Sequence, residues 1–150
     1  MKVYLGSDHQ GFALKQKVSA YLAKRKFDEE DLGNKELDPI DDFPQFAAAA
    51  ALKIIDNPKD FAILLCGGGQ GMAMAANRFR GVRAIVAASA DDAFYGRNDN
   101  DANILCLPAR LLDNPDEDAI WKDIIDTFLT TEFANAPRFI RRNHELDELA

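Results

Sequence analysis

The sequence predicts a three-layer α/β/α sandwich around a doubly wound, five-stranded parallel sheet. Short apolar segments alternate with helical patterns along the chain, as they do where helices join parallel strands. The interior strand candidates are apolar at consecutive positions, residues 61–66 (FAILLC) above all, which is typical of strands that helices cover on both faces. The 150 residues hold no repeat and no low-complexity linker, so we expect one domain over residues 1–150.

The first strand and helix set this pattern. An apolar strand at 3–5 ends in the polar turn 6–9. Apolar residues then recur at near-helical spacing over 11–26, which predicts an amphipathic helix. Its lysines are expected on the faces away from the apolar stripe, at positions 15, 17, 24 and 26.

The remaining elements follow from similar signals. Pro44 fits the first turn of a helix that Asn57 and Pro58 stop. Residues 27–42 are acidic and weakly patterned, and hold at most a short strand before a loop. Further strands are expected at 27–32, 61–66, 84–88 and 103–109, and further helices at 44–57, 72–79, 90–98, 116–130 and from Pro137 onward. This order of elements is Rossmann-like.

Composition and charge narrow the class of protein. Hydrophobic residues make up 47% and charged residues 29%, which excludes global disorder. The net charge of −7 disfavours nucleic acids and anionic membranes as partners. The apolar runs are too short to cross a bilayer, and the N-terminus has no secretory h-region. Because two cysteines cannot form a disulfide framework either, we expect a cytoplasmic protein.

Functional residues are expected at one edge of the sheet. Ligands of doubly wound sheets bind beyond the carboxyl ends of the strands. In this sequence those ends correspond to the turns 6–10, 66–71 and 89–92 and to the loop after Leu107.

The strongest local feature is CGGGQG at 66–71, between a buried strand and a helix. Glycines let successive backbone N–H groups converge on an anion, so the turn predicts an oxyanion or phosphate cradle. It lacks the third glycine of a dinucleotide fingerprint and the Gly-Lys-Ser/Thr of a nucleotide P-loop. The structural alternative is tight packing of helix against strand.

Cys66 stands at the mouth of this turn, whereas Cys106 lies inside an apolar strand and is expected to be a core residue. A thiol that faces a helix N-terminus and nearby cations has a lowered pKa and can act as a nucleophile or as a proton-abstracting base. The alternative is a second core cysteine. A papain-like mechanism would need a histidine partner, and the chain has only His9 and His144, the latter expected in solvent.

Asp8 and His9 follow the first strand, where a polar pair can orient a substrate hydroxyl or phosphate. The alternative role for this pair is an N-cap of the following helix. The two cysteines and two histidines show no paired ligand spacing, so no metal site is expected.

The C-terminal segment carries an arginine cluster. Arg138 and Arg142 share one helical face, and such a cluster in an acidic protein indicates phosphate recognition. The alternative is a solvated helix face on which the arginines pair with Glu145 and Asp147.

Taken together, these motifs resemble the ribose-5-phosphate isomerase B and galactose-6-phosphate isomerase family of sugar-phosphate isomerases. The resemblance covers nearly the whole chain, with the motifs in order: GSDHQGFALK at 6–15, ILLCGGGQGMAMAANRFRGVRA at 63–84, RNDNDANILCLPARL at 97–111, then DTFLTTEF and PRFIRR. It implies a doubly wound α/β domain, a homodimer or tetramer with active sites between subunits, and no metal or organic cofactor.

The resemblance also implies a role for each matching residue. Cys66 matches the catalytic base, which moves a proton between C1 and C2 through a cis-enediolate. Asp8 matches a residue that contacts substrate hydroxyls, and Asn100 matches a substrate-contacting asparagine. The loop that stabilises the enediolate oxygen matches Gly67, Gly68, Gly69 and Gly71, and the phosphate-binding set matches His9, Arg110, Arg138 and Arg142. The C-terminal arginines are implied to serve a site shared with the neighbouring subunit.

Three positions depart from the family pattern. Gly68 stands where the ribose-phosphate enzymes carry Ser or Thr, and Asp99 where their R-x-H-N motif has histidine. Both family positions are associated with opening of the furanose ring. Phe139 also replaces a histidine of the R-H-x-R-R tail. Asp99 could still act as the acid–base group, provided that its pKa were raised.

The leading hypothesis is an aldose–ketose isomerase of a phosphorylated sugar, of the ribose 5-phosphate type, with Cys66 as base. One alternative substrate is a tetrose or tetrulose 4-phosphate, which cannot close a furanose ring through its phosphorylated O4 and needs no ring-opening residues. Allose or galactose 6-phosphate is another. The alternative outside enzymes is a non-catalytic sugar-phosphate-binding subunit, against which the presence of Cys66 argues.

Overall fold

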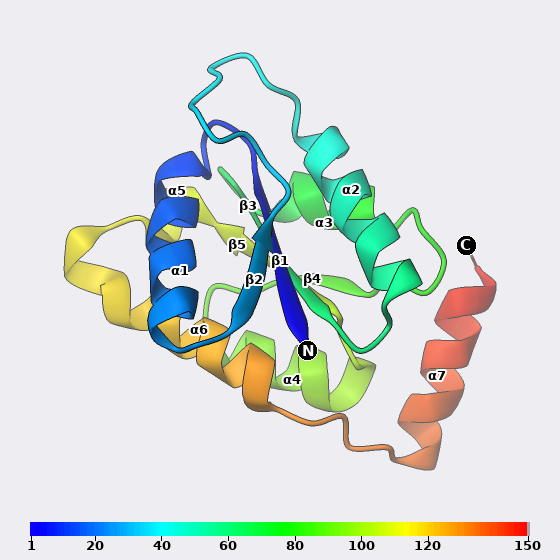
Figure 1. The fold of residues 1–150 in the computed structure, drawn as a ribbon. Helices are drawn as coiled ribbons and strands as arrows, with labels where there is room; N and C mark the ends of the chain where they lie inside the picture. The colour runs from blue at the N-terminus through cyan, green and yellow to red at the C-terminus, as the bar shows by residue number, and fades with distance from the viewer. Residues whose placement is uncertain (150) are drawn as a thin grey trace.

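The computed structural model describes residues 1–149, in which five strands form one central sheet (Figure 1). The strands are β1 (Lys2–Ser7), β2 (Asp28–Asp31), β3 (Phe61–Cys66), β4 (Ala84–Val86) and β5 (Ile104–Pro108). Their order across the sheet is β2-β1-β3-β5-β4, and all neighbours are parallel. From β1 the chain adds β2 on one side and then crosses over to add β3 on the other. The expected doubly wound, Rossmann-like sheet is therefore confirmed, with its switch point between β1 and β3.

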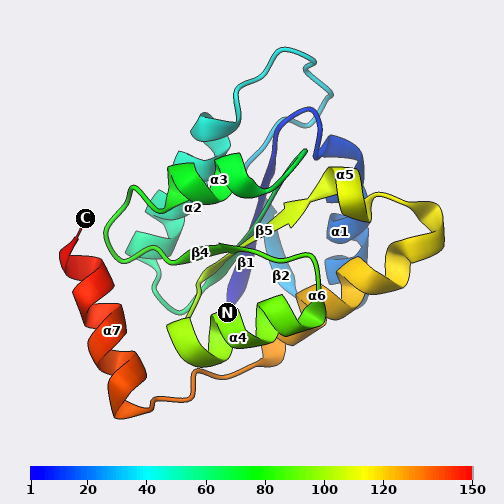
Figure 2. The same cartoon turned by 180° about the vertical axis from the view of Figure 1, so that it is seen from behind.

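Helices cover both faces of the sheet (Figures 1 and 2). They are α1 (Phe12–Lys24), α2 (Phe43–Asp56), α3 (Gln70–Ala76), α4 (Ala90–Asn100), α5 (Ala109–Leu112), α6 (Asp118–Thr130) and α7 (Pro137–Glu148), with a 3-10 turn at Pro115–Glu117. α1, α4, α5 and α6 pack on one face, and α2 and α3 on the other. α7 stands apart, beside the β4 edge, and contacts α4. Within residues 1–149 no helix is long and apolar enough to span a membrane.

The central strand β3 links the core to the site. Its residues after Phe61 are buried, and their side chains alternate between the two faces of the sheet. Ile63 and Leu65 pack with α1 and α6, whereas Leu64 and Cys66 pack with α2 and α3. Cys66 thus closes the strand with its side chain on the α2 and α3 face.

β4 ends at Val86, two residues before the predicted end of its strand. The backbone N–H groups of Ala88 and Ser89 both donate to Asp92 Oδ2, at 3.1 Å each. The Ser89 hydroxyl in turn accepts the Asp92 N–H, which completes a capping box for α4. These backbone N–H groups are therefore bonded to a side chain of α4 and are not available to continue the strand.

Lys15 was expected on a face of α1 away from the apolar stripe that is buried, and this prediction is wrong. This residue of α1 is fully buried, and its ammonium donates to both carboxylate oxygens of Asp31, at 2.9 and 2.7 Å. It also donates to the carbonyl oxygen of Asn34, at 2.9 Å. A buried ammonium needs such partners, and this one ties α1 to the end of β2 and to the loop after it.

Candidate active site

The turn after β1 places Asp8 at the switch point of the sheet. Its buried carboxylate accepts the backbone N–H groups of Gln10 (2.9 Å) and Gly11 (3.1 Å) through Oδ1. Gly11 must be glycine because a Cβ there would collide with the backbone of Leu65 on β3. Asp8 therefore fixes the turn that leads into α1, a role similar to the N-cap predicted as the alternative for this pair. The N-cap residue itself is Gly11, which directly precedes the helix. Both of the hydrogen bonds to Asp8 go to Oδ1, and no donor among residues 1–149 bonds to Asp8 Oδ2.

Cys66 ends β3 and is only 6% exposed. The backbone N–H of Gly69 donates to Cys66 Sγ at 3.1 Å. Gly69 has a φ of 76°, in the left-handed region, and a Cβ there would lie 3.1 Å from Val86 Cγ1. The glycine-rich turn thus directs at least one amide at the predicted base.

Cys106 lies on the neighbouring strand β5, fully buried. Burial raises the pKa of its thiol, and the nearby Cys66 adds to this effect. Cys106 therefore stays protonated, and its expected place in the core is confirmed.

Arg110 reaches the glycine turn from α5. Its backbone N–H donates to the carbonyl oxygen of Gly67 at 3.0 Å. Its guanidinium lies against Gly67, with Nε 2.8 Å from the place that a Cβ would occupy. The structure therefore brings Arg110 to the turn at 67–71, at the residue that Gln10 of the turn after β1 also approaches.

Two glutamines that the sequence analysis missed also line this turn. Gln10 Oε1 lies against Gly67, and Gln70 Oε1 fills the space that a side chain at Gly68 would take. Both are polar residues inside the predicted turns 6–10 and 66–71, and that position is the signal that could have identified them.

Two more residues were missed: Asp41 in the loop from residue 32 to residue 42, and Phe43 at the start of α2. Asp41 Oδ1 accepts the backbone N–H of His9 at 2.9 Å and lies 2.8 Å from His9 Nδ1. The hydrogen bond to Asp41 raises the pKa of His9, and the negative charges of Asp8 and Asp41 raise it further against partial desolvation. The ring of Phe43 packs against Gly71. No periodic pattern marks residues 27–42, so nothing in the sequence placed this loop at the site.

The other predicted site residues lie at the opposite edge of the sheet. α4 starts after β4 and runs back, so Asp99 and Asn100 lie near the level at which β4 begins. Arg138 and Arg142 are exposed on α7. Because a five-residue strand spans about 17 Å, Asn100 near the start of β4 lies roughly that far from Cys66 at the end of β3. Within one chain, the structure does not bring the two groups together.

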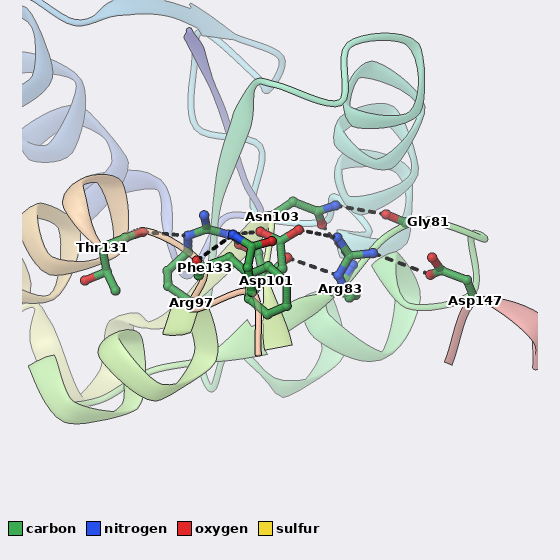
Figure 3. A network of polar contacts seen from close by, with 10 residues as sticks. Gly81, Arg83, Arg97, Asp101, Asn103, Thr131, Phe133 and Asp147 are labelled. Carbon is green, nitrogen blue, oxygen red and sulfur yellow. Dashed lines mark hydrogen bonds and ion pairs between the residues drawn. The ribbon is translucent and has the colours of Figure 1, made fainter. Parts of the chain in front are cut away.

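A polar network lies next to this second group, at the C-terminal end of α4 (Figure 3). The buried Arg97 donates to Asp101 Oδ1 at 2.8 Å, and Arg83 donates to Asp101 Oδ2 at 3.0 Å. Arg83 also contacts Asp147 on α7, at 3.5 Å. The network links the C-terminal end of α4 to α7 and so positions Asn100 relative to that helix. A cavity of about 610 Å³ lies between α7 and the start of β4.

The alternative prediction, in which the arginines of α7 pair with Glu145 and Asp147 on a solvent-exposed face, holds only in part. Arg141 pairs with Glu145 at 3.6 Å, and Arg138 lies over the ring of Phe139. Asp147 pairs with Arg83 of the main body instead of with an arginine of its own helix. Among residues 1–149, no group of three His, Cys, Asp or Glu side chains is placed to hold a metal ion.

Comparisons with known proteins agree on one family. The model of the Ribose/Galactose Isomerase family matches residues 3–146. A probable ribose-5-phosphate isomerase B of Mycoplasma pneumoniae is 40% identical over 87% of this chain and 84% of its own. A 4-deoxy-4-sulfo-D-erythrose isomerase of Clostridium sp. is 43% identical over 89% of this chain and 81% of its own. The crystal structure of ribose-5-phosphate isomerase B from Mycoplasma genitalium with bound ribulose-5-phosphate superposes with a TM-score of 0.90 at 36% identity, covering 99% of this chain and 95% of that one.

Proposed function

The chain belongs to the ribose/galactose isomerase family, and we propose on this premise that it interconverts the aldose and ketose forms of a phosphorylated sugar with Cys66 as the base. The observation that carries this assignment is the 3.1 Å hydrogen bond from the Gly69 N–H to Cys66 Sγ. This bond directs a backbone donor at the sulfur at the carboxyl end of β3, next to further backbone N–H groups of the same turn.

The proposed reaction begins when the Cys66 thiolate removes the C2 proton of the open-chain aldose. The C–H electron pair becomes the C1–C2 double bond, and the carbonyl electrons move to O1, which gives a cis-enediolate. Backbone N–H groups of the turn at 67–71 stabilise this negative charge. The proton on O2 then moves to O1, and the Cys66 thiol returns its proton to C1. Asp8 Oδ2 is proposed to accept a hydrogen bond from a hydroxyl group of the substrate.

The active site is proposed to form between two copies of the chain, in a homodimer or tetramer. Asp8, His9, Cys66 and Arg110 gather at one edge of the sheet, whereas Asp99, Asn100, Arg138 and Arg142 lie at the other. A neighbouring copy that presents its α4 end and α7 to the first edge would complete the site. His9 and Arg110 would then bind the terminal anion from one chain, and Arg138 and Arg142 from the other.

Ribose 5-phosphate is the first substrate to test, because a relative carries bound ribulose-5-phosphate. A second candidate is a four-carbon sugar with a terminal phosphate or sulfonate. Gly68 and Asp99 replace the residues associated with ring opening, and the 43% identical relative is a 4-deoxy-4-sulfo-D-erythrose isomerase. Such a sugar cannot form a furanose ring through C4, so its isomerase needs no ring-opening group.

Proton NMR in D2O tests these proposals. Candidate substrates are the phosphates of ribose, erythrose, allose and galactose, together with 4-deoxy-4-sulfoerythrose, and the readouts are C2 proton exchange and ketose formation. We expect Cys66→Ala to lower turnover by at least about a hundredfold, since a general base contributes on that scale. Cys106→Ala is the matched control, and it should cost stability but keep activity because Cys106 lies in the core.

The outcomes separate the candidates. Exchange that depends on Cys66 with one substrate identifies the isomerase and its chain length. Activity on ribose 5-phosphate with none on either tetrose would remove the four-carbon candidate. If wild type and Cys66→Ala bind sugar phosphate equally and neither exchanges the C2 proton, the chain is a binding subunit instead.

The protein is also proposed to be cytoplasmic, a location that fits a reduced thiol as the base.

A further inference from the structure

His9 and Asp41 form a pair that the sequence does not reveal. They are 32 positions apart, and two hydrogen bonds join them. Asp41 Oδ1 accepts the backbone N–H of His9 and lies 2.8 Å from Nδ1 of the ring. The same oxygen therefore holds both the main chain and the imidazole of His9.

The environment of Asp41 requires a cationic partner. Its side chain is only 2% exposed, whereas the His9 side chain is 32% exposed. Asp41 Oδ2 accepts a hydrogen bond from Asn34 Nδ2 at 3.1 Å. Among residues 1–149, His9 is the one side chain that makes an ion pair with this carboxylate. A buried carboxylate is costly unless it is both hydrogen-bonded and paired with a cation, so the pair favours the imidazolium form of His9.

The loop that carries Asp41 is itself tied to the body of the protein. Lys15 holds the carbonyl oxygen of Asn34 at 2.9 Å, and the side-chain amide of Asn34 holds Asp41. A continuous chain of polar contacts thus runs from the buried ammonium of α1 to the imidazole at the end of β1. Asp41 is therefore a fixed acceptor rather than a mobile surface acid.

The position of the proton decides what the ring can do. With Nδ1 bonded to Asp41, the other ring nitrogen points away from the carboxylate. In the neutral ring that keeps its proton on Nδ1, Nε2 is only an acceptor, whereas in the imidazolium it is a donor. An anionic substrate group needs the donor, so His9 can bind it through Nε2 only when the ring is charged.

We propose that Asp41 is a positioning residue that orients His9 and keeps it an imidazolium, so that Nε2 donates to the terminal anion of the substrate. The inference deepens the proposed function, on which its reference to a substrate rests. Asp41 itself does not contact the substrate. It determines instead the range of pH over which the anion is bound.

The sign of the pH dependence follows from the charges around His9. Asp8 on the same turn and Asp41 on the facing loop are negative, and Arg110 approaches Gly67 from α5. The hydrogen bond to Asp41 is the largest cause of the raised pKa of His9. The anion-binding donor is thus present below that raised pKa and is lost as the pH rises through it. Without the Asp41 charge, the loss should occur at lower pH.

The first test is the NMR titration of the two histidine rings in the intact protein, without substrate. His144 is exposed and serves as an internal reference. We expect His9 of the wild type to titrate above the ordinary histidine value of about 6.5, and Asp41→Asn to move the His9 titration to lower pH. Asp42→Asn is the matched control, since Asp42 is the exposed neighbour and caps α2 with no side-chain hydrogen bond.

The second test is the pH dependence of KM and kcat. Between the His9 titration midpoints of variant and wild type found in the first test, we expect KM of Asp41→Asn to be about tenfold higher, the size of one charge-assisted hydrogen bond, while kcat changes much less. Below both midpoints the variant should approach the wild type. A merely structural role for Asp41 would lower activity equally at every pH.

Each outcome bears on the inference. It is overturned if His9 of the wild type titrates below the ordinary histidine value of about 6.5, a result that needs no variant to fold. It is also overturned if Asp41→Asn leaves the His9 titration or the KM profile unchanged. If no sugar substrate turns over, the proposed function fails; titration of His9 in the presence of inorganic phosphate then still tests whether the pair controls anion binding.

Discussion

At the scale of the residue, Gly69 meets two demands at once. Its φ of 76° suits glycine, and its N–H is directed at Cys66 Sγ. Gly81 has a similar φ of 83°, but nothing lies within 4 Å of the place where its Cβ would stand. The two glycines thus share a backbone conformation and differ in their surroundings.

We predict that Gly69→Ala loses both stability and activity, whereas Gly81→Ala loses only stability. A left-handed conformation costs an alanine about 1 kcal/mol at either position. At Gly69 the new Cβ would also press on Val86, so the unfolding free energy should fall further, and the Cys66 contact should be disturbed. Urea unfolding and turnover of both variants measure the difference. Equal turnover in the two variants would contradict a role for the Gly69 amide.

At the scale of the element, α1 carries two lysines in different environments. Lys15 is buried against Asp31, and Lys17 makes a more exposed pair with Asp113, at 2.8 Å. The spacing of apolar residues predicts which face of a helix is buried. It does not predict which charged residue a neighbouring strand and loop will also bury. The end of β2 and the loop after it enclose Lys15, because β2 pairs with β1 beside α1.

We predict that Lys15→Met lowers the unfolding free energy by about 2 kcal/mol, because Asp31 and the Asn34 carbonyl lose their shared donor. The value is below that of a fully buried pair, since the Asp31 side chain is 28% exposed. Lys17→Met, two residues along the same helix, should cost much less, because the ion pair of Lys17 with Asp113 is exposed to solvent. Urea denaturation of both variants gives the comparison, and similar losses would show that Lys15 is not the anchor. KM should also rise for Lys15→Met, because the loop that carries Asp41 loses its tether.

At the scale of the whole molecule, the distribution of the predicted site over two edges of the sheet has a direct test. We predict that mixing inactive Cys66→Ala with an inactive Arg138→Ala/Arg142→Ala variant, with exchange of subunits, restores activity. In a statistical mixture of dimers, about a quarter of the sites would then hold only native residues. Turnover after mixing is the measurement.

The matched control is a mixture of Cys66→Ala with His9→Gln. Cys66 and His9 lie at the same edge of one chain, so no mixed dimer of these variants contains an intact site. This mixture should stay inactive. Activity in the control, or none in the first mixture, would contradict a site shared between two chains.

The sequence by itself determined the order and type of the elements, the doubly wound sheet and the edge where Asp8, His9 and Cys66 meet. Apolar runs and glycine-rich turns are local signals, because the residues that form each of them are close together in the sequence. Only the tertiary structure decided that Lys15 is buried, that Asp41 holds His9, and that Asn100 and Arg142 lie far from Cys66 in the same chain. These facts depend on how a patternless loop folds back and on the direction in which α4 and α7 leave the sheet. Contacts between residues that are distant in sequence are set by packing, and no periodicity records them.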